Sequence, residues 1–397
     1  MPAMKTPTRR ASRGFTIVEM LVGVLIGLIG TVVIFQVFAV SEGQKRTTTG
    51  AGDAQQNGVF TLFQLERDLR TAGFGLAHLP LLGCQTNGWN EQTAQPISFP
   101  LLPVSIADGA AGAPDTVTIA YSDADLFFAP EKLRVSQPVG DPTFAFIPDR
   151  TYGFRPGDVL LAAQETKPCT LRQVSSVAVA NVNHASGVYV NLQGQADATR
   201  FNRPGGLPAP NNVTYDRYSP VTSTGGRLFN LGPQPVVVRY AVSAGQLTAT
   251  DLLTPGAATA TVALADGIVQ LQAQYGFDAN GDGRIAPGSA SVATVATAAG
   301  SADQWGDAMP AGALAADWAK VIAVRLAVVA RSITPERPDP VTGVCNTTTV
   351  NPKWVAPSPP AGIDLDIQAD PDWRCFRYRT FEVAVPLRNM VWFAQPS

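Results

Sequence analysis

Six residues in the last third of the chain have the types and spacing of a calcium-binding loop. Asp278, Asn280 and Asp282 stand at alternate positions, and Gly283 follows at the sixth. Oxygen ligands at alternate positions with a glycine at the sixth open a Ca²⁺ loop of the EF-hand kind. The twelfth position holds Ser289, where that loop has a glutamate that binds the ion with two oxygens.

Asp303 or Asp307 would have to supply the missing ligand, so we expect calcium to bind weakly if it binds. A bound ion would stiffen the loop after a strand, which is a structural role. The residues leave an alternative open. Asp and Asn accept hydrogen bonds from nearby backbone N–H groups, and glycines adopt positive φ, so the same sequence suits a polar turn without metal.

Glu19 is the second residue with unusual chemistry, because it is the only charged residue between Phe15 and Val40. A segment of this length and composition can cross a hydrocarbon layer of about 30 Å as a helix. Even on lenient insertion scales, a carboxylate inside lipid costs roughly 2.5 to 3.5 kcal/mol. Glu19 therefore needs a partner of opposite charge.

The residues on either side of the apolar segment predict that it is a retained membrane span. Lys5, Arg9, Arg10 and Arg13 precede it without any acidic residue, which places this end on the cytoplasmic side. The segment ends in Val37-Phe38-Ala39-Val40, whereas a secretory signal peptide ends in small residues of the A-x-A kind at its cleavage site.

Residues 13 to 21, RGFTIVEML, resemble the prepilin motif of type IV pilins and type II secretion pseudopilins. The resemblance implies that a prepilin peptidase cleaves between Gly14 and Phe15 and that the new amine of Phe15 is methylated. It also implies that Glu19 pairs with the Phe15 amine of a neighbouring subunit. The alternative is a simple signal anchor in which Glu19 lies near the lipid headgroups.

The chain divides into a leader (1–14), a transmembrane and assembly helix (15–40), a periplasmic amphipathic half of the same helix (41–73) and a β-rich head (74–397). In the second half of the helix the apolar residues recur at helical spacing, with charged residues on the other face. The apolar residues are Val59, Leu62, Phe63, Leu65 and Leu69, and the charged ones are Glu66, Arg67, Asp68 and Arg70. Four glycines between residues 43 and 58, together with Thr47 to Thr49, predict a hinge or an unwound stretch between the halves.

The head is predicted to consist of short strands and long loops, since the chain has 36 glycines and 32 prolines. Three segments show apolar residues at every second position, namely 267–277, 321–331 and 379–387. We expect them to form an antiparallel sheet that packs on residues 41–73 through one apolar face, with 267–277 half-buried. Residues 286–316, rich in Ala, Gly, Ser and Thr, are expected to form a surface loop.

Three further segments resemble PilW-type minor type IV pilins: 67–74 (RDLRTAGF), 272–278 (QAQYGFD) and 383–389 (VAVPLRN). The resemblance implies an α+β, type IV pilin-like fold with an enlarged β-rich head. It implies a subunit held in the inner membrane by a single span, with its head in the periplasm, that later enters a cell-surface pilus. Its partners would be the major pilin and other minor pilins, with which it primes assembly near the tip, often beneath a PilY-type adhesin. Residues 180–235 match no part of the family.

The four cysteines, Cys84, Cys169, Cys345 and Cys375, would lie outside the cytosol, where oxidation is expected. Four cysteines allow three pairings. We favour Cys84 with Cys169 and Cys345 with Cys375. The second bridge would close a loop of about 30 residues and stabilise the fold by about 3 to 4 kcal/mol in the chain-entropy model.

Composition argues against two other classes of function. The formal net charge of −2 provides no general basic field, so nucleic acid is not the default partner. The chain has only two histidines, His78 and His184, and none of the common hydrolase or nucleotide-binding motifs, so we expect a structural subunit rather than an enzyme. The alternatives that stay open are a minor pseudopilin of a type II secretion system, and a surface adhesin or DNA-uptake receptor.

Overall fold

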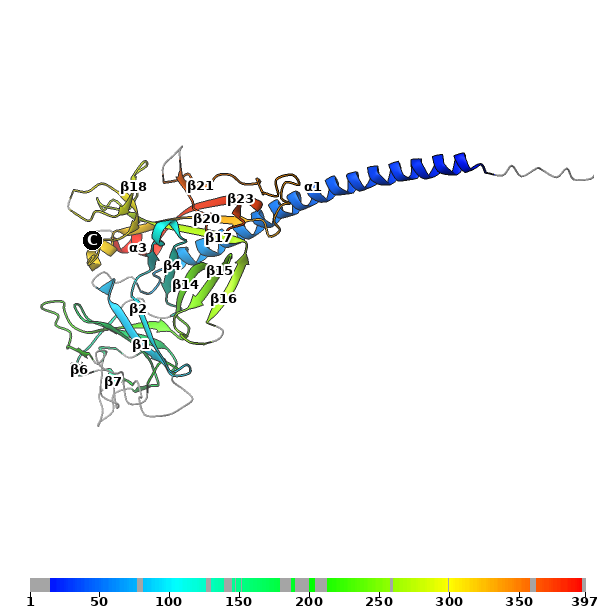
Figure 1. The fold of residues 1–397 in the computed structure, drawn as a ribbon. Helices are drawn as coiled ribbons and strands as arrows, with labels where there is room; N and C mark the ends of the chain where they lie inside the picture. Colours follow the sequence, from blue (N-terminus) through cyan, green and yellow to red (C-terminus); the bar gives the residue numbers. More distant parts are fainter. Residues whose placement is uncertain are drawn as a thin grey trace, which may run out of the picture.

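In the computed structural model of the chain, the described residues are 15–76, 81–125, 130–138, 145–146, 148–150, 152–178, 187–189, 200–203, 213–257, 260–298, 300–357 and 362–394. They build one long helix and a head of β-sheets at its far end (Figure 1). This is the α+β, type IV pilin-like fold that the sequence predicts.

The helix α1 (Ile17–Thr71) is 55 residues long. Thr16 caps its start, because its side chain accepts a hydrogen bond from the backbone N–H of Glu19. The helix ends just before Gly73, whose φ of +77° suits glycine.

The predicted hinge in α1 is wrong, because the helix runs without a break through residues 43–58. The hydroxyl of Thr47 lies 3.1 Å from both the carbonyl oxygen of Gly43 in the helix and the Glu336 carboxylate, and it can donate to either. Gly58 faces the sheet so closely that a Cβ atom there would lie 2.0 Å from the ring of Phe381. The glycine at this position allows helix and sheet to approach closely, which does not require the helix to bend.

The predicted apolar face of the second half of α1 is correct only in part. Leu65 and Leu69 are fully buried, but Phe63 is 61% exposed and Val59 is also exposed. Asp68, predicted on the polar face, is buried, and the hydroxyl of Tyr240 donates a hydrogen bond to its carboxylate. Strands from two sheets contact α1. The buried surface of the helix therefore includes Asp68 as well as Leu65 and Leu69, and it leaves out Val59 and Phe63.

The main sheet has the strand order β18-β19-β17-β20-β23, and its antiparallel centre is the predicted one. Its central strands are β17 (Ile268–Phe277), β20 (Val321–Arg331) and β23 (Tyr378–Pro386). Helix α1 packs against β20 and β23. The three predicted strands and their packing on the helix are confirmed.

Strand β17 is not half-buried, as predicted, but covered on both faces. Leu271 and Ala273 point into the core beside α1, while Gln270 and Gln274 are also buried on the opposite face. Trp354 and other side chains from the segment between β20 and β23 cover that second face. A shift in register after Ile268 also turns Val269 to the second face, away from the residues with which its spacing groups it.

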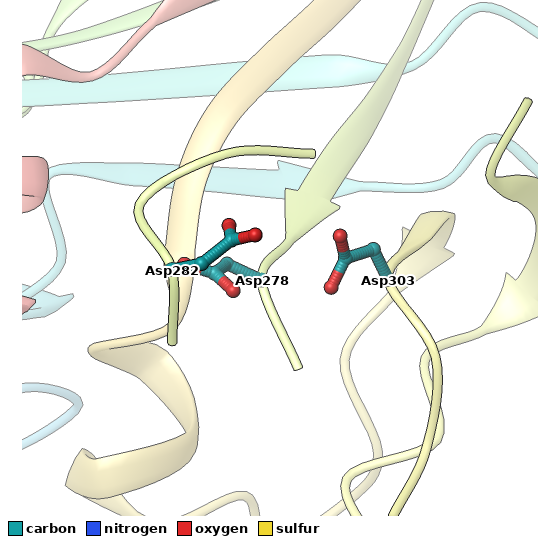
Figure 2. A group of neighbouring side chains, drawn as sticks. All are labelled: Asp278, Asp282 and Asp303. Carbon is teal, nitrogen blue, oxygen red and sulfur yellow. The ribbon is translucent and has the colours of Figure 1, made fainter. Parts of the chain in front are cut away.

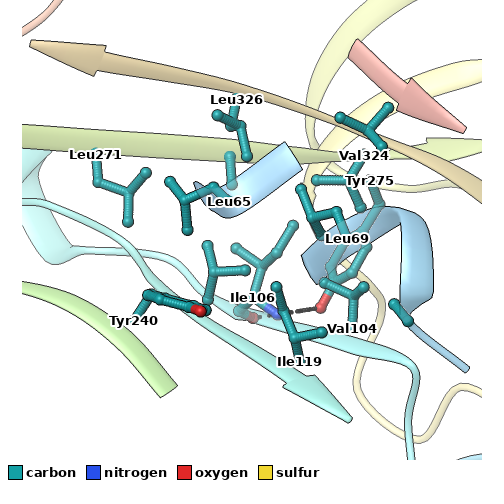
Figure 3. Packing of buried hydrophobic residues seen from close by; sticks show 14 of the residues in the cluster. Leu65, Leu69, Val104, Ile106, Ile119, Tyr240, Leu271, Tyr275, Val324 and Leu326 are labelled. Carbon is teal, nitrogen blue, oxygen red and sulfur yellow. Dashed lines mark hydrogen bonds between the residues drawn. The ribbon is translucent and has the colours of Figure 1, made fainter. Parts of the chain in front are cut away.

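A second sheet lies against the other side of α1, with the order β16-β15-β14-β4-β3. Its strands are β3 (Val104–Ala107), β4 (Thr116–Tyr121), β14 (Val236–Ser243), β15 (Gln246–Asp251) and β16 (Thr261–Asp266). Figure 3 shows Leu65 and Leu69 of α1 between Leu271 and Leu326 of the main sheet and Ile119 and Tyr240 of the second. The end of the helix is thus the shared core of both sheets.

A third sheet, with the order β2-β1-β9-β8-β13-β5, has a separate core and lies apart from α1 (Figure 1). Its strands are β1 (Gln85–Asn90), β2 (Gln95–Pro100), β5 (Glu131–Lys132), β8 (Val159–Ala163), β9 (Cys169–Gln173) and β13 (Arg227–Gly232). The disulfide Cys84–Cys169 joins the start of β1 to β9, and Cys345–Cys375 closes the segment before β23. This is the pairing that we favoured from the sequence.

Residues 286–316 form two strands at the edge of the main sheet and not the predicted surface loop. Strand β19 (Gln304–Ala308) pairs antiparallel with β17, and β18 (Ala290–Thr294) pairs parallel with β19. These small and polar residues lack the alternation that identifies a strand in the sequence. They are strands because the backbone of β17 offers unpaired hydrogen-bonding groups at its edge.

Small elements complete the described chain. The helices are α2 (Ala315–Trp318) and α3 (Arg388–Ala394), with short 3-10 turns at Ala110–Gly112 and Trp373–Cys375. The strands are β6 (Gln137–Pro138), β7 (Ala145–Phe146), β10 (Ser176–Ala178), β11 (Gly187–Tyr189), β12 (Thr214–Tyr215), β21 (Lys353–Trp354) and β22 (Ile363–Asp364).

Candidate functional site

The first candidate site is the start of α1, where the sequence predicts processing and assembly. Gly14 and the leader lie outside the described residues, so the cleavage position is not part of the structure. Phe15 and Glu19 are exposed at the free end of the helix. Within the described part of the chain, Glu19 has no cationic partner. The described residues therefore supply no cation for its carboxylate.

The apolar part of α1 leaves the head without contacts to it. The segment of α1 that is long and apolar enough to cross a membrane has none of its residues buried, from Ile17 to Val40. Figure 1 shows this half of the helix projecting from the sheets. A bare apolar helix is stable only in lipid or against other apolar helices. The structure is therefore consistent with membrane anchoring and with packing into a pilus.

The second half of α1 is fixed to the head by polar contacts as well as by its core residues. The amide of Asn57 donates to the carbonyl oxygen of Asp266 (3.0 Å), and Arg379 donates to Gln55 (3.0 Å). Burial raises the pKa of Tyr240, whose hydroxyl donates to Asp68. These contacts connect the second half of the helix to both sheets of the head.

The second candidate site is the loop after β17, which brings together three carboxylates (Figure 2). One oxygen from each of Asp278, Asp282 and Asp303 lies within 4.8 Å of the others. Asp303 comes from the segment before β19, so it is the closing carboxylate that the sequence offers as one of two choices. Asp307, the other choice, is not part of this group, and its carboxylate accepts a hydrogen bond from Gln274 (2.6 Å).

The carboxylates of this loop already have backbone partners. Asp278 accepts from the N–H groups of Gly281 and Gly283, both at 2.7 Å. Asp303 accepts from Ala279 and Ala286, at 3.1 and 2.9 Å. The carbonyl oxygen of the Asn280 side chain accepts from the N–H of Asp282, and its amide donates to the Asp282 carboxylate. The structure thus contains the polar turn, with three acidic groups placed close enough to hold a cation.

The sequence does not reveal the stacked arginine on the outer face of the main sheet. The guanidinium of Arg325 in β20 lies over the rings of Trp305 (4.6 Å) and Trp354 (5.7 Å). It donates to the side-chain oxygen of Gln274, and burial lowers the pKa of Arg325 to about 10. The one signal in the sequence is Arg325 itself, a charged residue in the middle of the apolar strand β20. The structure shows that Trp305 and Trp354, from other segments, cover the face on which it lies. The other two notable residues, His78 and His184, lie outside the described residues.

Two family models match this chain. Residues 236–389 match the model described as Type IV Pilus-assembly protein W, or PilW, and residues 9–35 match the prokaryotic N-terminal methylation motif. No curated protein and no solved structure matches the chain. The first match runs from β14 through the main sheet into α3, which includes the strands that pack on α1.

The two matches agree with the structure at both ends of the molecule. The methylation motif covers the end of the leader and most of the exposed apolar helix, and the PilW match covers the sheet that holds the helix. The family is one of structural pilins and pilus-assembly subunits. Together the two matches support a PilW-type type IV pilin.

Proposed function

We propose that this protein is a minor pilin that primes pilus assembly and occupies a place in or near the pilus tip. The observation that carries the proposal is the free apolar half of α1, which has a single carboxylate, Glu19, and no partner for it within the described chain. A subunit of this form needs lipid while it is stored and needs other helices once it is assembled.

The proposed assembly step depends on two charges at the start of the mature chain. Cleavage between Gly14 and Phe15 would free an ammonium group, and methylation would leave it positively charged. In hydrocarbon, this ammonium of one subunit and the Glu19 carboxylate of its neighbour each stabilise the other, because neither has water to solvate it. The pair would fix the axial register of the two helices, while apolar packing from Phe15 to Val40 would hold them together.

The proposed partners follow from the family. They are the prepilin peptidase, the major pilin, other minor pilins and, at the tip, a PilY-type adhesin. The proposed location is the inner membrane, crossed once, with the head in the periplasm, followed by the pilus on the cell surface. The head would then be the part that contacts partners, and α1 would be the part that packs into the fibre.

The test is Glu19→Ala in cells that assemble pili. The variant should be cleaved and inserted normally, with Phe15 as its first residue by mass spectrometry, but be absent from purified pili because the Phe15 amine has lost its partner. Glu19→Asp, which keeps the charge, should restore part of the incorporation. Pili that contain Glu19→Ala at the normal level would refute the register role. Loss of protein secretion with normal pili would favour the pseudopilin alternative.

We also propose that calcium binds weakly at Asp278, Asn280 and Asp282. Asp303 supports this proposal because it comes from a separate segment and places a third carboxylate beside Asp278 and Asp282. An ion there would connect the end of β17 to the segment before β19 and stiffen that edge of the head.

A further inference from the structure

A loop at the base of the head lies beside α1 at the point where the helix leaves the sheets. After β20 the chain passes Gly50 of α1, where Ser332 would contact an added Cβ atom at 3.0 Å. It then reaches Thr47, whose hydroxyl donates to the Glu336 carboxylate (3.1 Å). The chain therefore moves toward the membrane end of α1 as it leaves β20 (Figure 1). We refer to residues 337–344, which follow, as the base loop.

Both ends of the base loop are fixed. The Glu336 carboxylate accepts a hydrogen bond from Arg377 (2.8 Å), and its backbone N–H donates to the carbonyl oxygen of Cys375 (2.7 Å). At the other end, Cys345 is bonded to Cys375. The loop is thus held to the start of β23 and to α1, and its position relative to the helix is set by the fold.

The tip of the base loop presents an apolar side chain to the outside. The Asp339 carboxylate accepts hydrogen bonds from the backbone N–H groups of Val341 and Thr342, both at 2.8 Å. The N–H of Gly343 donates to the carbonyl oxygen of Asp339 and closes the turn. Val341 at the tip is 91% exposed, and Val344 is 48% exposed. Singly exposed valines are ordinary, so Val341 and Val344 are of interest here because of where the fold places them.

Distances along the chain show which surface is within reach. Thr47 lies seven residues beyond Val40, the last residue of the apolar span, which corresponds to about 10 Å of helix. The headgroup layer of a bilayer fills most of that distance, at roughly 5 to 8 Å on each side. Glu336, which contacts Thr47, therefore lies roughly 2 to 6 Å outside the headgroup layer, so the base loop that follows it starts beside the headgroups.

Positive charge near the base loop also favours contact with the headgroup layer of the membrane. Arg337 in the loop and Lys45 on α1 are both exposed. Basic side chains at this height are attracted to anionic headgroups. The carboxylate of Asp339 is turned toward the backbone of its own loop by the hydrogen bonds from Val341 and Thr342.

We propose that the base loop rests in the headgroup layer of the membrane that holds α1, with Val341 and Val344 touching the acyl boundary. This inference rests on the proposed membrane-stored form of the subunit. The contact is intramolecular with respect to the anchor, so even a small apolar surface suffices to hold the loop at the lipid. It fixes the tilt of the head before the subunit enters a pilus, and the contact is broken when the helix is extracted.

The test places a fluorescent label on the tip of the loop in the full chain. All four native cysteines are paired, so Val341→Cys provides a single thiol for the environment-sensitive dye NBD. The labelled protein is reconstituted in phosphatidylethanolamine–phosphatidylglycerol vesicles that contain lipids with a nitroxide near the headgroup. The chain offers a matched control in Val221→Cys, since Val221 is 92% exposed in a turn near the third sheet.

We expect blue-shifted NBD emission at position 341 and its loss in the nitroxide vesicles, with neither effect at position 221. Equal emission and equal quenching at the two positions would overturn the inference while leaving the anchor intact. Vesicle flotation separates the two failures: a chain that does not float with the vesicles refutes the membrane-stored form itself, and the loop contact with it.

Discussion

Arg172 in β9 is the most unusual single residue of the head. Its side chain is fully buried, and none of its three guanidinium nitrogens has a hydrogen-bond partner in the described structure. Burial lowers the pKa of Arg172 to about 10, which reflects the free-energy cost of a charge in an apolar core. An electrostatic interaction with Tyr215 opposes this shift.

Arg172→Met should therefore stabilise the protein, because it replaces an unpaired buried charge with an apolar chain of similar length. We expect the free energy of unfolding to rise by about 1 to 3 kcal/mol. Urea denaturation of the detergent-solubilised chain would measure it. The control is Arg155→Met, at a side chain that is 58% exposed, where the change should stay within about 0.5 kcal/mol. Clear destabilisation by Arg172→Met would mean that the guanidinium has a partner after all.

The calcium loop gives a second prediction for individual residues. With a dissociation constant of about 1 mM, 10 mM Ca²⁺ should stabilise the protein by about 1.4 kcal/mol. The melting temperature should therefore rise by about 2 °C and return after EDTA. Asp303→Asn should remove this calcium-dependent increase, since it removes the third carboxylate. An unchanged melting temperature for the native chain in calcium would refute the site, and an equal increase in the variant would exclude Asp303 as a ligand.

Among the elements, α1 shows how far local sequence patterns can mislead. Glycine and threonine weaken an isolated helix, which is why residues 43–58 predict a hinge. In the folded chain, Gly58 allows the ring of Phe381 to approach, and the tertiary contact compensates for the weak propensity. Which role a glycine plays depends on a residue more than 300 positions away, and the local pattern does not contain that information.

Two alanine substitutions in α1 separate the packing role from the hinge role. Gly58→Ala should destabilise the protein by about 1 to 3 kcal/mol, because its Cβ would overlap the Phe381 ring. Gly52→Ala should stabilise it by up to about 1 kcal/mol, since nothing lies within 4 Å of the added atom and alanine favours the helix. Thermal unfolding would measure both. Stabilisation by both substitutions would be the result expected for a hinge.

Strands could be predicted from the sequence where apolar residues alternate along one face. Alternating apolar residues identify β17, β20 and β23 and the face that packs on α1. The pattern does not show that Trp354 and its neighbours cover the other face, because that layer comes from a distant segment. Because the sequence pattern does not contain this layer, it predicts that Gln270 and Gln274 face solvent, although both are buried.

In the molecule as a whole, the two ends of the chain carry the family features, and the third sheet lies between them in sequence. The methylation motif and the PilW match leave residues 36–235 outside both. This stretch contains the second half of α1 and all six strands of the third sheet. The predictions of processing and pairing at the start of α1 rest on a short local motif, and residues 9–35 match the methylation-motif model. Asp303 lies beside Asp278 because β19 pairs with β17 at the edge of the main sheet. The sequence pattern does not predict that pairing.

Asp115 links the two sheets that hold α1, so its ionisation bears on the stability of the whole head. Its carboxylate accepts hydrogen bonds from the backbone N–H of Gly109, before β4, and of Ala273 in β17. Burial raises the pKa of Asp115 to about 7, although these two hydrogen bonds oppose the shift. Asp108 and Asp307 also raise it by like-charge repulsion.

The sign of the pH effect follows from this shift. Between about pH 4 and pH 7 the folded chain holds a proton on Asp115 that the unfolded chain has lost, so stability falls as pH rises, by up to about 1.4 kcal/mol per pH unit. Urea midpoints of the native chain from pH 4.5 to 8 should show this decline and level off above pH 7. Asp115→Asn should remove the decline, whereas Asp372→Asn at an exposed position should keep it. If the native chain and Asp115→Asn have the same pH slope, Asp115 is already ionised at pH 5, and the joint between the sheets does not respond to pH.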